Sequence, residues 1–424
     1  MERIIKIGKT LRNNWKKSTV GAFALYYAAA TAKERYEINI LMQAACKEAV
    51  KYGDALIPMD RNPTTITVIL NPVANKRKAK QEFEKYCEPL LHLAGLQVEV
   101  IQTTSEGNAK EIVETLRGTE AIIVAGGDGT LSETVTGLLR RNDGANQFPL
   151  GVLPLGRTNT LGNTLFPGGK GVEKVKQLIE ASMAIIKGNT VWKDAMKIEP
   201  IAMEEEVPNK PIYALTSVEW RAFRDTLAKR DKYWIYGPLR DYMSFIFNGY
   251  KESLAWACSG MIKYTPPCEG CSNCMEKRRE PSKRWLFFIP NTYAAQQSDR
   301  SAVENPECLN TEELCFKTCD FKIQTPNIIR TNNSIPSLQV KIGKNNYSYT
   351  EFVAEGWKRL NGENDNAKTI PVRTVEFRPR IDEDKEITIS IDQEEFEAKP
   401  VKITLLPKVV KLFCKQPQVN ISDE

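Results

Sequence analysis

The sequence is poor in histidine. Its 424 residues include a single histidine, His92. Metal sites built from several histidines are therefore excluded, and a Ser-His-Asp or Cys-His mechanism would have to use His92. Because His92 shares a helical stripe with Leu90 and Leu93, we expect it to be structural. If the chain is an enzyme, we expect carboxylates, lysines, backbone amides or a carboxylate-bound metal to do its chemistry.

Long apolar runs and a strong charge excess are also missing. The apolar run at residues 20–32 spans 13 residues, whereas a membrane-spanning helix needs about 20. The net charge of the chain is +6, which is too small and too thinly spread to indicate a nucleic-acid partner. A content of 42% hydrophobic and 26% charged residues is typical of a globular protein.

Most of the charge excess lies near the N-terminus. Residues 1–17 hold six basic side chains and one acidic side chain, a local charge of +5, directly before the apolar run. A basic, acid-poor segment of this kind predicts a mitochondrial targeting sequence or an interfacial membrane anchor. The alternative is an exposed basic helix without a targeting role. We assign residues 1–60 to this segment and the helix that follows it.

From residue 65 onward, short apolar runs alternate with segments of helical periodicity. Alternation of this kind predicts an α/β domain in which a doubly wound, mostly parallel sheet is covered on both faces. We assign residues 61–192 to this domain. The expected strands are residues 66–70, 98–101, 121–125 and 150–153, and the expected helices are residues 79–93, 109–116, 131–139 and a segment around 172–179.

The pattern changes after Trp192. Alternating apolar residues at 338–342 and 401–405 are typical of half-exposed antiparallel strands. We therefore expect a β-rich, sandwich-like second domain over residues 193–414, which would bind the substrate. A stretch rich in proline, cysteine and charge near residues 265–335 is expected to be a surface insertion, and residues 415–424 a tail.

One turn carries the strongest chemical signal. The apolar run at residues 121–125 leads into Gly126, Gly127, Asp128, Gly129 and Thr130, followed by an expected helix. Glycines allow close backbone approach, and the N-terminus of the helix offers unpaired amides, so the turn can bind phosphates. A carboxylate at Asp128 could hold Mg²⁺ beside those phosphates. The turn is neither a Walker loop nor a dinucleotide-binding Gly-x-Gly-x-x-Gly turn.

Two further turns should meet the first at the carboxyl edge of the sheet, where doubly wound folds bind ligands. One is Asn71-Pro72, after the first expected strand. The other contains Gly156, Thr158 and Asn159, after the fourth. Together the three turns predict a nucleotide site.

The order of these motifs resembles the diacylglycerol and sphingosine kinase catalytic superfamily. Within that superfamily the chain is most similar to the mitochondrial acylglycerol kinases, through three further motifs beginning at Trp220, Lys232 and Gly237. The residues that carry the superfamily resemblance are Asn71-Pro72, Thr103 with Gly107 and Ala109, residues 126–130 with Glu133 and Gly137, residues 154–156 with Asn159, and residues 391–394.

The resemblance implies an activity. It implies transfer of the γ-phosphoryl group of ATP, with Mg²⁺, to the hydroxyl of a mono- or diacylglycerol, giving lysophosphatidic or phosphatidic acid. It also implies a place on the intermembrane-space side of the mitochondrial inner membrane and a carrier-import translocase as a partner. The alternatives are a sphingolipid kinase, a sugar or dinucleotide kinase of related fold, and a non-catalytic assembly or import factor.

The resemblance also implies roles for single residues. Asp128, Asp392 and Glu394 would be catalytic, with Asp392 a candidate base and Asp128 and Glu394 candidate Mg²⁺ ligands. Asp194 would contact the substrate. The nucleotide contacts would come from Asn71, Pro72, Thr103, Gly126, Gly127, Asp128, Gly129, Thr130, Gly156, Thr158 and Asn159.

Two positions depart from the superfamily pattern. An acidic residue often follows the third turn, but this chain has Thr160, so we expect that turn to have less of a role in metal binding. Arg157 could contact a phosphate there, or it could be a surface residue. The late Asp-Gly-Glu motif has Gln393 in place of glycine.

Residues 220–256 interleave aromatic and basic side chains. This pattern suits a lipid-facing mouth at a headgroup interface, and it equally suits the core and rim of the second domain.

Three cysteines are closely spaced at Cys268, Cys271 and Cys274. Close thiols suit structural Zn²⁺, and Cys308, Cys315 or Cys319 could supply a fourth ligand. Disulfides in an oxidising compartment and unmodified thiols are the alternatives.

Overall fold

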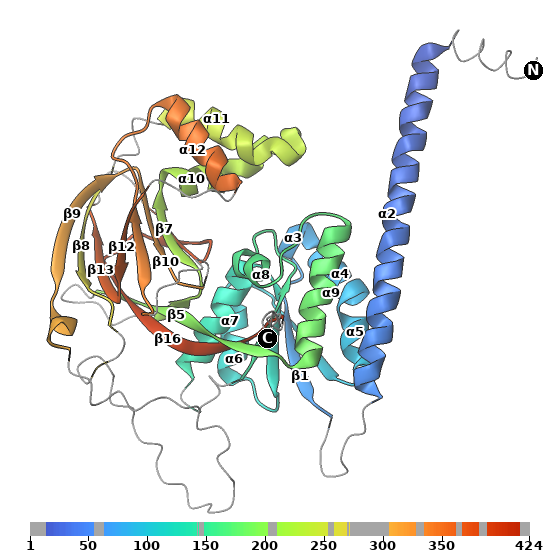
Figure 1. Ribbon diagram of the computed structural model, residues 1–424, viewed down its shortest axis with the longest axis horizontal. Coiled ribbons are helices and arrows are strands. Elements are labelled where there is room, and N and C mark those ends of the chain that lie inside the picture. The colour runs from blue at the N-terminus through green and yellow to red at the C-terminus, as the bar shows by residue number, and fades with distance from the viewer. Residues whose placement is uncertain are drawn as a thin grey trace, which may run out of the picture.

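The protein consists of two units joined by two long strands, with one helix projecting from the first unit (Figure 1). The computed structural model describes residues 14–54, 63–141, 143, 148–201, 210–252, 258–268, 271, 305–327, 335–361, 367–380 and 388–415.

The first unit contains the expected parallel strands. β1 (Thr65–Leu70) pairs with both β2 (Gln97–Gln102) and β3 (Ala121–Gly126), and β3 pairs with β4 (Leu150–Pro154), all in parallel. Every residue of β3 and β4 is buried, because helices cover both faces of the sheet. The predicted fold class of this unit is confirmed.

Helices pack on the two faces of this sheet in separate clusters. Phe83 and Leu178 belong to the cluster on one face, and Val113 and Val135 to the cluster on the other. The helices are α3 (Ala74–Arg77), α4 (Ala79–Tyr86), α5 (Glu88–Leu93), α6 (Asn108–Thr115), α7 (Asp128–Arg140), α8 (Thr160–Leu165) and α9 (Val172–Lys187).

The helix expected over residues 79–93 is broken in two at Cys87. Pro89 lies in the first turn of α5, where its missing N–H is tolerated, whereas inside a continuous helix it would break a hydrogen bond. His92 lies on the exposed side of α5, 3.9 Å from Glu88, and is not part of the core.

The second unit is a sandwich of antiparallel strands, as expected. One sheet continues from β4 in the order β16-β13-β8-β9, with β5 and β6 attached, and the other has the order β12-β11-β10-β7-β14-β15. Side chains such as Trp220, Phe321 and Phe377 fill the space between the sheets. The strands are β5 (Thr190–Pro200), β6 (Ile212–Ala214), β7 (Ser217–Arg221), β8 (Cys258–Thr265), β9 (Glu312–Thr318), β10 (Asp320–Gln324), β11 (Leu338–Ile342), β12 (Lys368–Val372), β13 (Thr374–Pro379), β14 (Thr388–Ile391), β15 (Glu394–Glu397) and β16 (Val401–Phe413).

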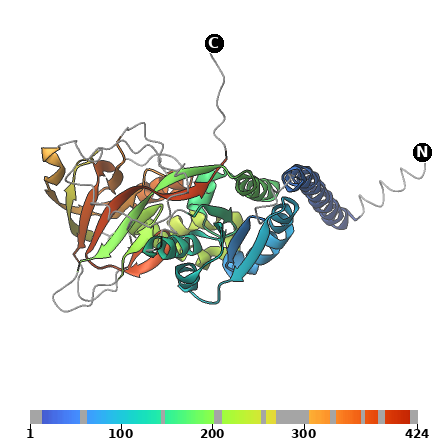
Figure 2. The same cartoon turned by 90° about the horizontal axis from the view of Figure 1, so that it is seen from below.

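Strands β5 and β16 run side by side through both units (Figure 2). Near its end, Leu412 of β16 pairs in parallel with Leu150 of β4, and Phe413 is buried among the helices of the first unit. The expected domain boundary at residue 192 therefore falls inside β5, and the chain returns to the first unit at residue 410.

Helices that the sequence did not predict lie at one end of the sandwich (Figure 1). Phe223, Phe245 and Phe352 bring three of them together over the sheet. These elements are α10 (Ala222–Ala228), the 3₁₀ segment η2 (Lys229–Leu239), α11 (Arg240–Glu252) and α12 (Tyr349–Leu360), and a further 3₁₀ turn, η3 (Pro306–Leu309), lies before β9.

The helix α2 (Trp15–Gly53) precedes the first unit. Its C-terminal part packs Ala45 and Ala49 against Leu90 and Met183, whereas Phe23 and Tyr26 near its start are each 75% exposed. The helix projects well beyond the unit (Figure 1). Among the described residues, no helix is sufficiently long and apolar to cross a membrane. Residues 1–13, which carry much of the basic charge, lie outside the described residues.

Candidate functional site

The glycine-rich turn joins β3 to α7 at the carboxyl edge of the parallel sheet. The helix begins at Asp128, so the amides of its first turn and its positive dipole end lie at this edge. The turn packs tightly against the third turn: the amide of Gly156 donates to the carbonyl of Gly126 at 2.8 Å, and a Cβ on Gly156 would collide with the backbone of Gly127. Only glycine permits this approach.

Asn71 links the first turn to the glycine-rich turn. Its Nδ2 donates to Oγ1 of Thr130 at 3.1 Å, and its Oδ1 accepts from the amide of Val73 at 3.1 Å. Thr103, at the end of β2, is 8% exposed, and its amide donates to the carbonyl of Leu70 at 2.9 Å. The turns that hold Asn71-Pro72, Thr103 and Thr130 thus meet at one edge.

The third turn is closed by Asn159. Its Oδ1 accepts from the amide of Gly156 at 3.0 Å, and its Nδ2 donates to the Gly156 carbonyl at 2.8 Å. The carbonyl of Thr158 accepts from the amide of Asp128 at 3.0 Å. The expected nucleotide residues of this turn therefore lie against the glycine-rich turn.

Asp128 is buried and faces the start of α8. Its Oδ1 accepts from the amide of Thr160 at 2.8 Å, and its Oδ2 accepts from the Thr160 hydroxyl at 2.9 Å. Burial raises the pKa of Asp128 to about 6. Thr160 stands where the superfamily often has an acidic residue. Its hydroxyl donates a hydrogen bond to Asp128, which the side chain of an ionised acid could not do.

Asp392 is fully enclosed by hydrogen-bond donors. Its two oxygens accept from the amides of Leu215, Thr216 and Ser217 at 2.7 to 3.0 Å, and from the Thr216 hydroxyl at 2.5 Å. Burial raises its pKa despite these bonds. Gln393 beside it has φ +72°, the left-handed conformation that the superfamily's glycine would adopt without strain.

Glu394 is the late acid that faces a cleft. Its carboxylate lies over Gly129 so closely that a Cβ on this glycine would collide with Oε1. Burial, and then the charges of Glu133 and Glu106, raise the pKa of Glu394 to about 7, while Lys110 opposes the shift. These four charged residues line a cleft of about 590 Å³ between α6, α7 and β15.

The three acids predicted to be catalytic are brought together. The charge of Asp392 raises the pKa of both Asp128 and Glu394, so the three carboxyls lie in one region. The carboxylates of two of them, Asp128 and Asp392, accept hydrogen bonds from amides and hydroxyls of the protein itself.

The carboxylates in the cleft fit a divalent cation. Glu133 is held by the amides of Gly107 at 2.7 Å and Ala109 at 3.1 Å. Glu394 and Glu106 line the same cleft and remain as candidate metal ligands. Hard cations such as Mg²⁺ take oxygen ligands, and a cation here would relieve the repulsion that raises the pKa of Glu394.

The second unit contacts the third turn through η2. Arg157 forms an ion pair with Asp231, and Asp231 lies 3.8 Å from Arg240. Burial and the charge of Arg157 lower the pKa of Arg230. A cluster of guanidinium groups thus lies beside the turn that was expected to contact phosphate.

The aromatic and basic stretch divides into two parts. Trp220, Phe223 and Phe245 are buried in the second unit, as one interpretation predicted. Trp234 and Ile235 of η2 are 70% and 68% exposed, as the lipid-facing interpretation requires. Trp256, which belongs to the same stretch, lies outside the described residues.

Asp194 lies at an irregularity in the pairing of β5 with β16. Its Oδ1 accepts from the amide of Lys408 at 2.7 Å, and its carbonyl accepts from Nδ2 of Asn327 at 2.7 Å. Asn327 also donates to the carbonyl of Leu215, whose own amide donates to Asp392. The expected contact of Asp194 with substrate stays a prediction. The contacts that the structure describes for Asp194 hold the irregular pairing of β5 with β16 in place.

Sequence reasoning gave no role to Glu106, Lys110, Glu133, Thr160 or Asp231. Glu133 was visible as part of the resemblance, and its position in the second turn of the helix after the glycines was a usable signal. Asp231 gave none, because its partner Arg157 is remote in sequence.

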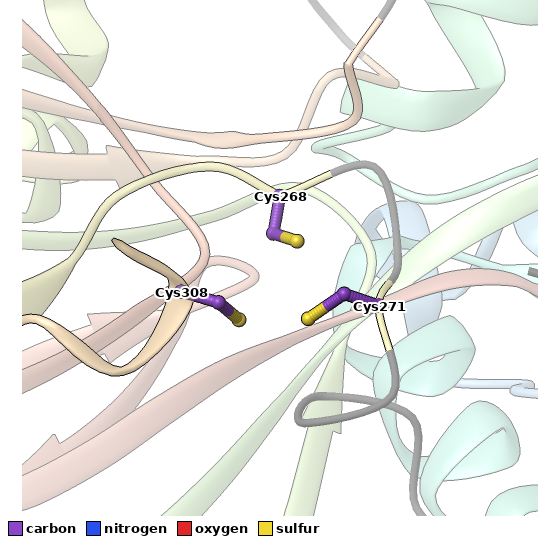
Figure 3. Close-up of side chains that lie close together, drawn as sticks. All are labelled: Cys268, Cys271 and Cys308. Atoms are coloured by element: carbon purple, nitrogen blue, oxygen red, sulfur yellow. The ribbon is translucent and has the colours of Figure 1, made fainter. Parts of the chain in front are cut away.

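The cysteine cluster differs from the expected one. Cys268, Cys271 and Cys308 point toward one another (Figure 3), and their sulfur atoms all lie within 4.8 Å. Cys315 is exposed on β9 and Cys319 donates to the carbonyl of Asn345, so neither belongs to the cluster. Cys274 lies outside the described residues.

Comparison with known proteins identifies both units. The family model of the diacylglycerol kinase catalytic domain matches residues 65–198, and that of the acylglycerol kinase C-terminal region matches residues 215–421. Human mitochondrial acylglycerol kinase is 36% identical over 420 residues, which cover 96% of each chain. The Xenopus laevis protein of the same name is 35% identical, over 98% of this chain and 96% of its own.

More distant relatives share part of the chain or only the fold. Mouse sphingosine kinase 1 is 28% identical over 52% of this chain and 58% of its own. A crystal structure from Bacillus anthracis, described as that of a candidate diacylglycerol kinase, has a TM-score of 0.52 at 15% identity, over 85% of this chain and 100% of its own. Identity along nearly the whole chain, together with the fold and the glycine-rich site, shows that the protein belongs to the acylglycerol kinase family of ATP-dependent lipid kinases.

Proposed function

We propose that this kinase phosphorylates the free hydroxyl of mono- and diacylglycerol at a mitochondrial membrane, giving lysophosphatidic and phosphatidic acid. The observation that carries the proposal is the position of Glu394, which lies directly over Gly129 with its pKa raised to about 7. A carboxylate there faces the place where the phosphates of ATP would lie.

The nucleotide phosphates bind along the glycine-rich turn. The first-turn amides of α7 after that of Asp128, and the side chains of Asn71 and Thr130, offer donors to phosphate oxygens. The third turn, locked by Asn159, closes the other side. Asp128 keeps these two turns together through Thr160.

Glu394 and Glu106, which line the same cleft, would hold Mg²⁺. When bound, the ion neutralises phosphate charge, which is a main requirement of phosphoryl transfer. Glu133 keeps the Gly107 turn fixed. Asp392 is a positioning residue, because all of its described contacts hold residues 215–217.

The acyl chains lie on η2. Trp234, Ile235 and Leu239 expose apolar surface, and Asp231 of the same segment is paired with Arg157 of the third turn. An acylglycerol on this surface would keep its apolar chains out of water while its hydroxyl reached the phosphate turns. Aromatic side chains suit the boundary between water and lipid.

The names of the two full-length relatives support a mitochondrial location. The basic N-terminal segment and the exposed apolar side chains of α2 suit the surface of the inner membrane on the intermembrane-space side. A carrier-import translocase would then be a neighbour, and a non-catalytic role in import is a separate activity that loss of the kinase site would not affect.

Purified full-length protein with radiolabelled ATP, Mg²⁺ and vesicles that contain oleoylglycerol tests the proposal. We expect labelled lysophosphatidic acid from the wild type and a loss of at least about 100-fold in Asp128→Ala. Vesicles with sphingosine and a solution of glycerol serve as comparison acceptors. Equal labelling by wild type and mutant, or faster labelling of sphingosine or free glycerol, would contradict the proposal.

A further inference from the structure

Three cysteines from two places in the chain converge in the second unit, away from the kinase residues. Cys268 lies three residues after β8, Cys271 follows it, and Cys308 lies in η3, before β9. Their sulfur atoms lie within 4.8 Å of one another (Figure 3). Cys271 and Cys308 are buried and Cys268 is half-buried.

Nitrogen donors contact two of the three sulfur atoms. Nη1 of Arg373 donates to Sγ of Cys308 at 3.2 Å, and Nδ2 of Asn305 donates to Sγ of Cys268 at 3.4 Å. Sulfur accepts hydrogen bonds weakly as a thiol, but a thiolate beside a guanidinium is stabilised by the opposite charge. Donors of this kind are typical of the outer shell of a metal site, where they orient the ligands.

We propose that Cys268, Cys271 and Cys308 bind one Zn²⁺ ion, with the fourth coordination position taken by solvent or another side chain. At a Zn–S distance of about 2.3 Å, ligand sulfurs of a tetrahedral ion lie about 3.8 Å apart, so a small movement of these side chains brings them onto the ion. Thiolate ligands favour zinc over the hard cations that carboxylates prefer.

Other uses of the cluster account for fewer of its features. A disulfide would join two of the sulfurs and leave the third thiol buried against the bond. Three free thiols would leave the Arg373 guanidinium facing an uncharged sulfur. One Zn²⁺ ion would bind all three sulfurs as thiolates, and the two nitrogen donors would then face charged acceptors.

The bound ion would act as a structural staple. It joins the segment that follows β8 to η3. Arg373, which directly precedes β13, is itself held to the end of β8, since its amide donates to the carbonyl of Thr265 at 3.0 Å. The ion therefore fixes one end of the sandwich without contact with the phosphate turns.

Metal analysis of the purified protein tests this proposal. The full chain is produced with zinc in the medium, purified under reducing conditions without chelators, and analysed for zinc by plasma mass spectrometry. We expect about one zinc per chain in the wild type and in Cys315→Ser, which removes an exposed thiol of β9 outside the cluster. We expect zinc to fall at least about tenfold in Cys308→Ser.

Two further measurements keep the test decisive if Cys308→Ser does not fold. Arg373→Met keeps the ligands and most of the stem, and should weaken zinc affinity about 10- to 100-fold in competition with a chelator. A mercurial that blocks thiols should release zinc from the wild type as it reacts. A wild type with little zinc, zinc retained in Cys308→Ser, or a mass two daltons lower without zinc, as for a disulfide, would overturn the proposal.

Discussion

A methyl group on either of two glycines of the phosphate turns would collide with a neighbour, but the two neighbours differ. A Cβ on Gly156 would meet the backbone of Gly127, whereas a Cβ on Gly129 would meet the Glu394 side chain, from Oε1 to Cγ. Backbone cannot move without distorting both turns, but a flexible side chain can turn away. A substitution at Gly156 should therefore affect mainly stability, and a substitution at Gly129 mainly activity.

We expect Gly129→Ala to fold with nearly unchanged thermal stability and to lose activity, because Glu394 is displaced from the phosphate turns. Gly156→Ala should lower the free energy of unfolding by about 1–3 kcal/mol through overpacking. Denaturant unfolding and the vesicle assay measure the two effects. Full activity in Gly129→Ala would contradict the assigned position of Glu394.

The raised pKa of Glu394 makes a prediction about stability. Its pKa is raised to about 7 in the folded protein from 4.5, so the ionised form disfavours folding once the pH exceeds 4.5. This penalty grows up to pH about 7 and is constant above it. Without ATP and Mg²⁺, Glu394→Gln should be more stable than wild type at pH 8 by about 1–2 kcal/mol, and the gain should disappear near pH 4.5.

Thermal unfolding of both proteins across this pH range measures the difference. Glu397→Gln is the matched control, since Glu397 lies exposed on the same strand β15. A gain that is as large at pH 4.5 as at pH 8 would contradict the assignment of the penalty to the charge of Glu394.

At the residue scale, the sequence predicted acids that the structure brings into one region, but not what each of them contacts. The motif pattern marks three acids but does not distinguish their surroundings. In the structure Asp128 contacts Thr160, Asp392 contacts Thr216, and Glu394 lies against Gly129. Those partners are set by packing between turns and strands far apart in the chain, so no local pattern predicts them.

At the element scale, η2 is the segment we assign to the lipid. The double variant Trp234→Ala with Ile235→Ala removes exposed apolar surface and should raise the KM for vesicle-borne acylglycerol about tenfold. Because the phosphate turns are untouched, kcat should change little. The control is Trp192→Ala, which removes an exposed tryptophan of β5. An unchanged KM in the double variant would rule out η2 as the docking segment.

The two ends of α2 have different surroundings and should have different roles. Removal of residues 1–32 leaves Ala45 and Ala49 packed on the first unit, so we expect thermal stability and activity on detergent-dispersed substrate to be retained. Binding to anionic vesicles should fall, because the basic segment and exposed apolar residues are lost. Cosedimentation with vesicles measures this, and unchanged binding would refute the anchor.

Helices and strands whose buried apolar residues form a regular pattern in the sequence were predictable, and elements without such a pattern were not. The parallel strands at residues 66–70 and 121–125 are buried runs between turns, and they were found within a residue or two. In η2 the apolar side chains are largely exposed, so no buried stripe marked it. The strand at 338–342 was expected to be half-exposed, yet Gln339, between its inward-facing apolar residues, is only 6% exposed.

For the whole molecule, the sequence predicted two domains, and the structure joins them by continuous strands. β16 starts in the sandwich and ends beside β4, and Asp392 and Glu394 come from the second unit to the phosphate turns of the first. Long-range pairing of this kind leaves no local signal. The site is therefore assembled only when both units are folded.

The most direct test of this account is single-turnover phosphoryl transfer by Glu394→Gln beside Glu397→Gln. Both variants remove one negative charge from β15, but only Glu394 lies over Gly129. With ATP, Mg²⁺ and oleoylglycerol vesicles, we predict that Glu394→Gln slows transfer at least about 100-fold while Glu397→Gln matches the wild type. Equal rates in the two variants would contradict the account.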